Sequence, residues 1–337
     1  MRKYIILVAC IMLAVTVVMQ NRPLPETAQP VPPELPQEPS PPVEPPEPPA
    51  VSEPVIVVDN ANELGRVPIL MYHRIVPEEG EWARSIENFR KDLENLYNRG
   101  YTLVNLSDFY DGKAQVPPGR SPVILTFDDA TQGQFNYLLD DGGDPYVDPD
   151  CAVGMLIEAN QRWPELGLAA TFFLNGNPFG QSAYWQDKLQ HLVELGFELG
   201  SHTYSHPFFN RITDDEIRAD IVKLQLQVWQ AVPEYDIRAL ALPYGIAPKD
   251  RSVAMSGSHE GTTFRHSYLL EVGAEPAFAP DHVRHNPRSM PRIAAADEHL
   301  TRWLDWLDGP MRRYVSDGNP DVLTYPDEMQ EQRKKTP

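Results

Sequence analysis

Short apolar runs rich in strand-forming residues alternate with amphipathic helical stretches, and no other feature of this sequence constrains the fold as strongly. Continuous apolar strands separated by helices indicate a parallel sheet covered on both faces, either open or closed into a barrel. The expected strands are Val67–Tyr72, Tyr101–Leu106, Val123–Phe127, Ala169–Leu174, Phe197–Gly200 and Ala239–Leu242.

Three other stretches have the pattern of helices. Between Ile86 and Leu96 the apolar side chains share one face, and Gly100 follows as a stop signal. A second helix begins at a capping box that starts at Thr213. A last helix, around Leu300–Leu307, precedes a polar segment, 316–337, which we expect to be a loosely held tail.

The first 54 residues differ in composition from the rest. Arg2 and Lys3 precede an uncharged run, Ile5–Met19, that is short for a membrane-spanning helix and typical of a signal sequence. We interpret residues 1–20 as a signal-anchor, with a cleaved signal peptide as the alternative. Residues 21–54 contain 14 prolines, six glutamates after Pro23 and no lysine or arginine after that proline, which is typical of a stiff linker.

This organisation predicts a folded domain at residues 55–315, located outside the cytoplasm in the periplasm or at the cell surface. Contact with a membrane is expected through the N-terminal segment alone, and we expect a monomer. The net charge of −19 argues against a nucleic-acid partner, because such binding requires a basic surface. The two cysteines, Cys10 and Cys151, lack the paired spacing of a zinc or redox motif.

Two polar clusters follow expected strands, and the carboxyl ends of strands are where sites assemble in α/β folds. Asp128 and Asp129 come directly after Val123–Phe127. Neighbouring side chains diverge, so one carboxylate can bind a metal while the other accepts a proton; a simple loop cap is the alternative interpretation.

The second cluster holds His202 and His206, which follow the strand that ends near Gly200. Histidines at positions i and i+4 can reach one metal ion. A zinc-peptidase helix needs a glutamate directly after its first histidine, and Thr203 stands there instead. The pattern therefore indicates a metal site that is not that of such a peptidase.

Taken together, three motifs resemble those of the polysaccharide deacetylase domain (NodB homology, carbohydrate esterase family 4). They are Thr126-Phe127-Asp128-Asp129, His202-Thr203-Tyr204-Ser205-His206 and Leu242-Pro243-Tyr244-Gly245. The resemblance covers roughly residues 67–293, and it implies a single catalytic domain with the fold of a deformed (β/α) barrel.

The resemblance also implies roles for individual residues. Asp129, His202 and His206 match a triad that binds one divalent metal ion, zinc in our interpretation, with cobalt, nickel or manganese as alternatives. Asp128 matches the general base. Pro243 and Tyr244 match the segment that contacts the substrate, where the backbone N–H of Tyr244 helps to hold the oxyanion.

Two positions depart from the family pattern. The arginine that usually precedes the proline of the third motif is replaced by Ala241. Arg238 has the opposite strand parity and is expected to point away, whereas Arg292 could substitute from elsewhere. The late histidine that usually acts as the general acid has no convincing copy.

A replacement for that acid lies at the start of the domain. Pro68-Ile69-Leu70-Met71-Tyr72-His73 resembles the opening strand of permuted family members, such as those acting on poly-N-acetylglucosamine, and this implies His73 as the acid. A histidine bonded only to backbone is the alternative, and His282 and His285 are rival acids.

From these residues we expect a hydrolase that removes N-acetyl groups from a cell-wall or exopolysaccharide of the N-acetylglucosamine type. Two alternatives remain. One is an inactive glycan-binding module of the same fold, and the other is an O-acetyl esterase acting on another acetylated glycan.

Overall fold

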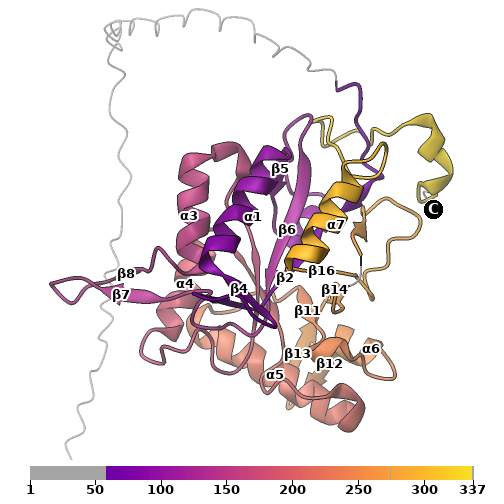
Figure 1. The fold of residues 1–337 in the computed structure, drawn as a ribbon. Coiled ribbons are helices and arrows are strands. Elements are labelled where there is room, and N and C mark those ends of the chain that lie inside the picture. The colour runs from indigo at the N-terminus through magenta and orange to yellow at the C-terminus, as the bar shows by residue number, and fades with distance from the viewer. Residues whose placement is uncertain (1–57, 274, 336–337) are drawn as a thin grey trace, which may run out of the picture. The chain divides into compact units, whose positions relative to one another are not determined.

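The computed structural model describes residues 58–273 and 275–335 (Figure 1). The expected signal segment, 1–20, and the proline-rich linker, 21–54, lie outside the described residues. In the part of the chain that the structure describes, no helix is long and apolar enough to cross a membrane.

An eight-stranded sheet forms the centre of the domain. Its strands are β2 (Ile69–Tyr72), β5 (Tyr101–Leu103), β6 (Ser121–Phe127), β9 (Thr171–Leu174), β10 (Glu198–Ser201), β11 (Ala239–Ala241), β14 (Tyr268–Leu270) and β16 (Ile293–Ala294). The strand order is β14-β11-β10-β9-β6-β2-β16, with β5 paired to the start of β6, and every pair is parallel. All six expected runs form strands here; β14 and β16 were not expected.

The register of the central strands brings the expected site residues to one edge of the sheet. Tyr72, the last residue of β2, pairs with Phe127, the last residue of β6, and Phe127 also pairs with Phe172 of β9. These strands are buried along their whole length. The residues that follow each strand therefore emerge together at the carboxyl edge.

The segment around β16 links the two edges of the sheet. The N–H of Met290 donates to the carbonyl of Leu269 in β14, and the N–H of Glu271 donates to the carbonyl of Met290. Ile293 pairs with Leu70 of β2 at the other edge. The sheet consequently curls, which confirms the fold class expected from the sequence, a deformed (β/α) barrel.

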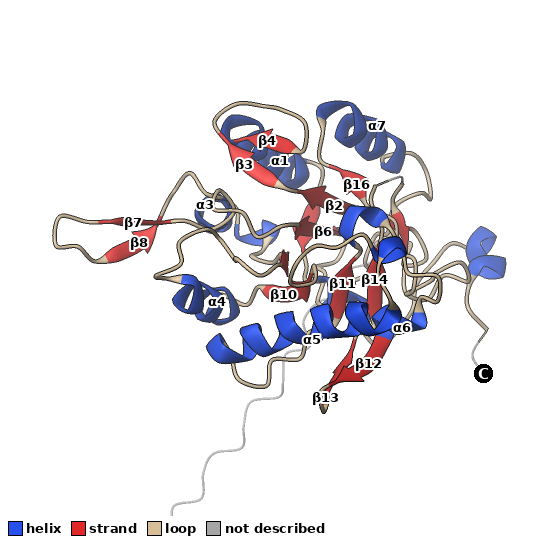
Figure 2. Ribbon diagram, turned by 90° about the horizontal axis from the view of Figure 1, so that it is seen from below, coloured by secondary structure: helices blue, strands red, loops and turns tan. Residues whose placement is uncertain are grey.

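Helices surround the curled sheet (Figure 2). They are α1 (Ile86–Asn98), α2 (Leu106–Tyr110), α3 (Ala152–Arg162), α4 (Trp185–Glu194), α5 (Asp214–Ala231), α6 (Ser252–Met255) and α7 (Asp297–Leu307), with short 3-10 turns η1 (Pro164–Leu166), η2 (Phe209–Arg211), η3 (Pro243–Gly245) and η4 (Asp327–Gln332). The Ser85 side chain caps α1, and Phe89, Leu93 and Leu96 bury its inner face. The expected capping box starts α5 at Thr213.

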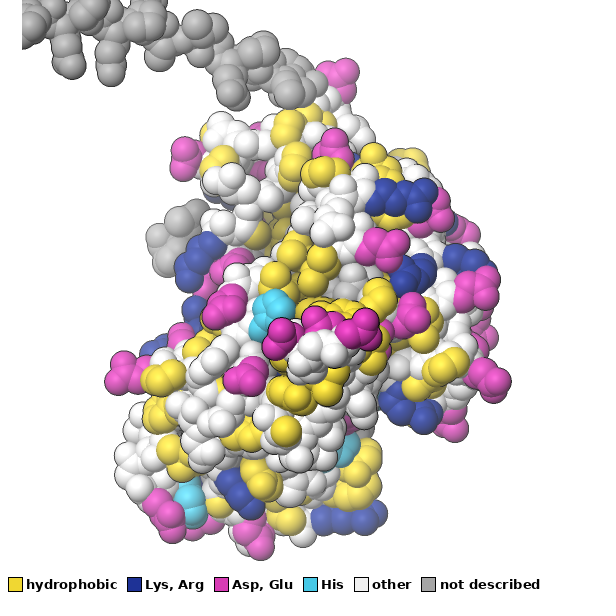
Figure 3. Space-filling view, turned by 90° about the vertical axis from the view of Figure 1, so that its left-hand side faces the viewer, with side chains coloured by type: hydrophobic (Ala, Val, Ile, Leu, Met, Phe, Trp, Pro, Cys, Tyr) yellow, Lys and Arg dark blue, Asp and Glu magenta, His cyan; other side chains and the backbone are white. Residues whose placement is uncertain are grey.

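Four short ladders lie outside the main sheet. They are β1 (Arg66–Val67) with β15 (Ala277–Phe278), β3 (Arg74–Val76) with β4 (Ala83–Ser85), β7 (Tyr137–Leu139) with β8 (Pro145–Val147), and β12 (Ser256–His259) with β13 (Thr262–Arg265). The β7–β8 hairpin projects from the domain with Leu139 and Tyr146 exposed. On the face that carries it, acidic side chains gather beside hydrophobic ones (Figure 3).

The polar segment from Ser316 differs from the expected loose tail, because residues 316–335 pack against the domain. The buried carboxylate of Glu63 accepts a hydrogen bond from the N–H of Thr324, and the N–H of Lys334 donates to the carbonyl of Asp281. Met329 in η4 is buried. Hydrogen bonds to residues outside the segment, which local composition does not reveal, hold it in place.

Candidate active site

The two carboxylates after β6 occupy different environments. The Asp128 side chain is 2% exposed, whereas that of Asp129 is 33% exposed. The backbone of Asp129 has a φ of 72°, in the left-handed region, and its carbonyl accepts a hydrogen bond from the side chain of Asn175. This turn directs the two side chains to different places, as expected from their adjacent positions.

The two histidines after β10 lie side by side. Their Nε2 atoms are 2.9 Å apart, and Nδ1 of His202 is 2.8 Å from the carbonyl of Ala241. That carbonyl can only accept, so Nδ1 of His202 carries the proton and Nε2 presents a lone pair. Burial lowers the pKa of His202 to about 4, which favours the neutral imidazole that a metal requires.

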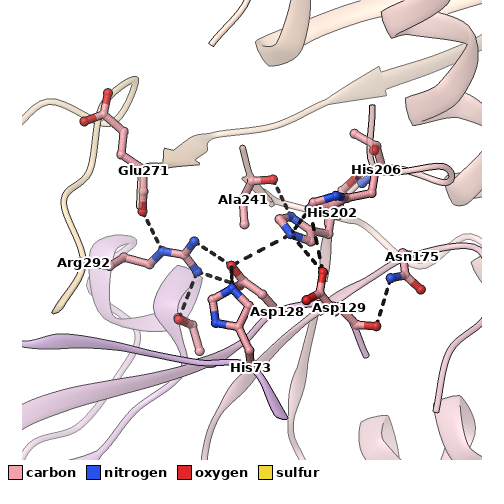
Figure 4. A network of polar contacts seen from close by, with 12 residues as sticks. His73, Asp128, Asp129, Asn175, His202, His206, Ala241, Glu271 and Arg292 are labelled. Carbon is pink, nitrogen blue, oxygen red and sulfur yellow. Dashed lines mark hydrogen bonds and ion pairs between the residues drawn. The ribbon is translucent and has the colours of Figure 1, made fainter. Parts of the chain in front are cut away.

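Asp129, His202 and His206 are spaced as the ligands of one cation would be (Figure 4). Oδ1 of Asp129 lies 3.5 Å from Nε2 of His202 and 3.7 Å from Nε2 of His206. Donors bound at about 2.0–2.2 Å to one ion lie roughly 2.9–3.6 Å from one another, depending on geometry. Two imidazoles and a carboxylate are also a donor set suited to zinc or a similar divalent ion. The residues therefore fit a metal ion and leave positions open for other ligands.

Asp128 is held by Arg292 instead. Nη1 and Nη2 of the guanidinium donate to the two carboxylate oxygens at 2.6 and 2.7 Å, and Nε donates to the carbonyl of Glu271. Burial opposes ionisation of Asp128, but the charge of Arg292 and nearby imidazoles hold its pKa well below the usual range. Arg292 thus occupies the place that the sequence left open at Ala241.

Arg238 lies elsewhere, as its strand parity predicts. Its guanidinium contacts the carboxylate of Asp111 and the hydroxyl of Ser267. It therefore makes no pair with Asp128.

His73 completes the wall of the cavity on the β2 side. Its Nε2 lies 3.9 Å from Oδ2 of Asp128, and the side chain is 16% exposed. Burial lowers the pKa of His73, although the charges of Asp128 and Asp129 oppose this. The rivals do not line this cavity: His285 stacks on Tyr110, and His282 contacts Gln332.

The third motif forms another part of the cavity wall. Pro243 is buried at the start of η3, and Tyr244 has a φ of 57° with a half-exposed side chain. The Tyr244 ring lies 4.3 Å from that of His206 and stacks on Phe208 at 3.9 Å between centroids. The strained backbone therefore places this aromatic ring beside the expected metal ligands.

One residue at the site was not found from the sequence. Trp82 lines the same cavity, with a φ of 53° and a side chain that is 51% exposed. Its ring lies 4.9 Å from that of His73. An isolated tryptophan in a polar loop gives no signal of this placement before the loop is folded.

These groups enclose a cavity of about 400 Å³ with divided chemistry. One part holds three side chains that could bind a metal ion. The second part holds the buried carboxylate of Asp128, and the third holds the imidazole of His73, which could take part in proton transfer. Proton transfer to and from a reacting group, next to a Lewis-acid site, is the machinery of hydrolysis at a carbonyl.

Comparison with known proteins shows similarity to deacetylases. A model of the polysaccharide deacetylase family matches residues 164–258. A chitooligosaccharide deacetylase of Sinorhizobium fredii is 28% identical over 39% of this chain and 51% of its own length. A peptidoglycan-N-acetylglucosamine deacetylase of Bacillus cereus is 25% identical over 38% of each chain. The chain thus spans about half the length or less of these curated relatives.

Solved structures share the fold. The Streptococcus pyogenes deacetylase PplD, in complex with acetate, matches with a TM-score of 0.55 and 17% identity over 72% of this chain and 99% of its own. IcaB from Ammonifex degensii matches with a TM-score of 0.50 and 16% identity over 73% and 98%. The family model over residues 164–258, the related sequences and the fold thus all make this domain similar to the polysaccharide deacetylase family.

Proposed function

We propose that this protein hydrolyses N-acetyl groups on a polysaccharide of the N-acetylglucosamine type and depends on a bound divalent metal ion. One observation carries the proposal: Asp129, His202 and His206 gather as a ligand set beside an aspartate, Asp128, that Arg292 keeps ionised.

In this proposal the ligand set and the base have different roles in the hydrolysis. A divalent ion, zinc in our proposal, supplies Lewis acidity to the attacking water and to the acetyl carbonyl when bound. Asp128 takes a proton from that water, and Arg292 keeps its carboxylate oriented and ionised. Separate residues are needed because a carboxylate engaged with the ion is a poorer proton acceptor.

The leaving amine needs a proton, and His73 is our proposed donor. It lines the same cavity as Tyr244, so an acetamide bound there can turn its nitrogen toward the imidazole. The backbone N–H of Tyr244 is proposed to hold the developing oxyanion. This places the acid on the N-terminal strand, as in the permuted family members that the sequence resembles.

The substrate class is supported by the relatives. They are deacetylases of chitooligosaccharide and of peptidoglycan N-acetylglucosamine, and both substrates contain N-acetylated sugars. The signal-like segment and the proline-rich linker support a location outside the cytoplasm, where such polymers lie.

Of the two alternatives, the inactive glycan-binding module drew its support from the absence of arginine near Ala241. The ion pair between Arg292 and Asp128 removes that support, since the base has an arginine partner. An O-acetyl esterase needs the same ligands and base, but an alkoxide leaves more readily than an unprotonated nitrogen anion, so a positioned acid such as His73 favours the amide substrate.

The test is a metal analysis of the purified protein followed by acetate release from N-acetylglucosamine polymers. We expect one divalent ion per chain and acetate release that chelation stops and zinc restores. A protein that binds the ion but releases no acetate from amide or ester substrates contradicts the proposal.

A further inference from the structure

A second cavity adjoins the catalytic one, and Trp82 stands at the boundary between them. Each has a volume of about 400 Å³, within the ~300–1,000 Å³ typical of small-molecule sites. His73, Glu81 and Trp82 line both. The second cavity continues from there past Gly80 to the first turn of α7 at Glu298.

The loop before β4 holds Trp82 in a fixed position. The N–H of Arg74 donates to the Trp82 carbonyl at 3.2 Å, and the Arg74 guanidinium donates to the Glu81 carbonyl at 2.9 Å. Gly80 and Ala83 exchange two backbone hydrogen bonds across the turn. A bulky residue with positive φ and an exposed ring is a strained arrangement, and such strain concentrates at ligand sites.

An exposed indole between two cavities suits a sugar chain. A hexose ring has one face made of C–H groups, which stacks on a flat aromatic ring while the hydroxyls at its rim remain free for hydrogen bonds. Trp82 can therefore support a sugar that extends from the catalytic cavity into its neighbour.

The charges of the second cavity restrict which sugar it accepts. Glu79, Glu81 and Glu298 line it, and Arg84 is the only lysine or arginine among its described lining residues. The Arg84 guanidinium is already engaged by carboxylates of Asp92, Glu79 and Asp297. No lysine or arginine among the described lining residues is free to receive a sugar carboxylate, so a neutral or amino sugar is favoured.

We propose that this cavity is a second sugar subsite, with Trp82 as the residue that recognises the neighbouring unit. The inference rests on the proposed function, because it assumes that the acetylated unit occupies the catalytic cavity. The substrate is then an oligomer or polymer of neutral or amino hexoses, and a single sugar leaves half of the binding surface unused.

The test is the affinity of the zinc-loaded, full-length protein for N-acetylglucosamine oligomers of one to four units, measured by calorimetry. We expect affinity to rise about tenfold from one unit to two or three, since a stacked aromatic contact alone contributes about two- to tenfold. Trp82→Ala should remove this gain, and Trp82→Phe should keep most of it. Glu94→Gln, at an exposed site on α1 outside both cavities, is the matched control and should behave as wild type.

A second variant fills the cavity without altering the indole. A Cβ at Gly80 meets only Ala83 at 3.7 Å, so Gly80→Leu should be tolerated and should also remove the gain. An equal gain in Trp82→Ala, or no gain with length in the wild type, overturns the proposal.

Two further measurements complete the experiment. A disaccharide that carries a uronic acid beside the acetylated unit should bind more weakly than its neutral counterpart, and equal affinity contradicts the charge argument. Acetate release is followed in parallel: length-dependent binding without release contradicts the proposed function while supporting the role of Trp82.

Discussion

The two sides of the catalytic cavity differ in how far their charged side chains are buried and paired. On the closed side, the side chains of Asp128 and Arg292 are 2% and 0% exposed and satisfy each other through two hydrogen bonds. On the open side, the side chains of Asp129 and His206 are 33% and 23% exposed and have no comparable partner among the described residues. Two consecutive aspartates thus differ in environment: Asp128 is buried and paired, whereas Asp129 is partly exposed.

This difference in burial and pairing offers a reason for two adjacent carboxylates at the site. A buried charge is tolerated only with a well-placed counter-charge, and that pairing would keep Asp128, the proposed base, ionised. A ligand set must instead stay accessible and incompletely satisfied, so that an ion and a substrate can enter. Because Asp128 and Asp129 follow the end of β6 at Phe127 and point in different directions, neighbouring residues can meet these two requirements.

We expect the largest effect from substitutions of the proposed metal ligands on the open side. His206→Ala or His202→Ala removes a ligand, and we expect loss of the bound ion and a fall in turnover of roughly 10³-fold or more. Metal analysis and acetate release measure the two effects. His259→Ala, on the β12–β13 hairpin, is the control. Full metal content in the doubly substituted protein would reject the ligand assignment.

Breaking the closed side should mainly affect stability. Arg292→Met leaves Asp128 buried without its counter-charge, and removal of one partner of a buried pair costs about 3–5 kcal/mol. Arg238→Met breaks a more exposed pair with Asp111 and should cost clearly less. Denaturant unfolding measures both. Similar losses in the two variants would contradict the special role of the closed side.

A smaller effect is expected at His73, which borders both sides. His73→Ala should slow amide cleavage by roughly 10²-fold, while cleavage of an aryl acetate changes only a few-fold, because a phenolate leaves without a proton. The ratio of the two rates is the measurement. If both rates fall equally, His73 is not the acid.

The smallest effect concerns Lys188, a buried cation with no carboxylate partner among the described residues. Lys188 is fully buried, and its ammonium donates to the carbonyls of Phe135 and Phe179. Burial lowers its pKa to about 8. Below pH 8 the charge is buried at a cost; from there to the unfolded value of about 10.4, the unfolded chain holds more protons, so stability rises with pH. We therefore expect the unfolding free energy of the wild type to rise relative to that of Lys188→Met between pH 8 and 10; parallel curves would contradict this.

Much of the fold was predictable because its signals are local. The apolar runs gave the central strands, and the capping box at Thr213 marked the start of α5. The ligand set was predictable because parallel strands deliver their following residues to one edge. The roles of these residues remain predictions.

The features that could not be predicted from the sequence depend on contacts between distant segments. Arg292 was one of two candidates, and only the curl of the sheet through β16 brings it to Asp128, 164 positions away. Strand β16 is two residues long and has no apolar pattern of its own. Trp82 was missed because a loop held by hydrogen bonds to Arg74 sets its position.

The central claim is that adjacent aspartates do different work, and one paired measurement tests it most directly. Metal content and acetate release are compared in Asp128→Asn and Asp129→Asn. We expect Asp129→Asn to lose the ion and the activity together, whereas Asp128→Asn keeps one ion per chain and loses roughly 10²-fold or more in turnover. Loss of the ion from Asp128→Asn, or full turnover in that variant, would contradict the division.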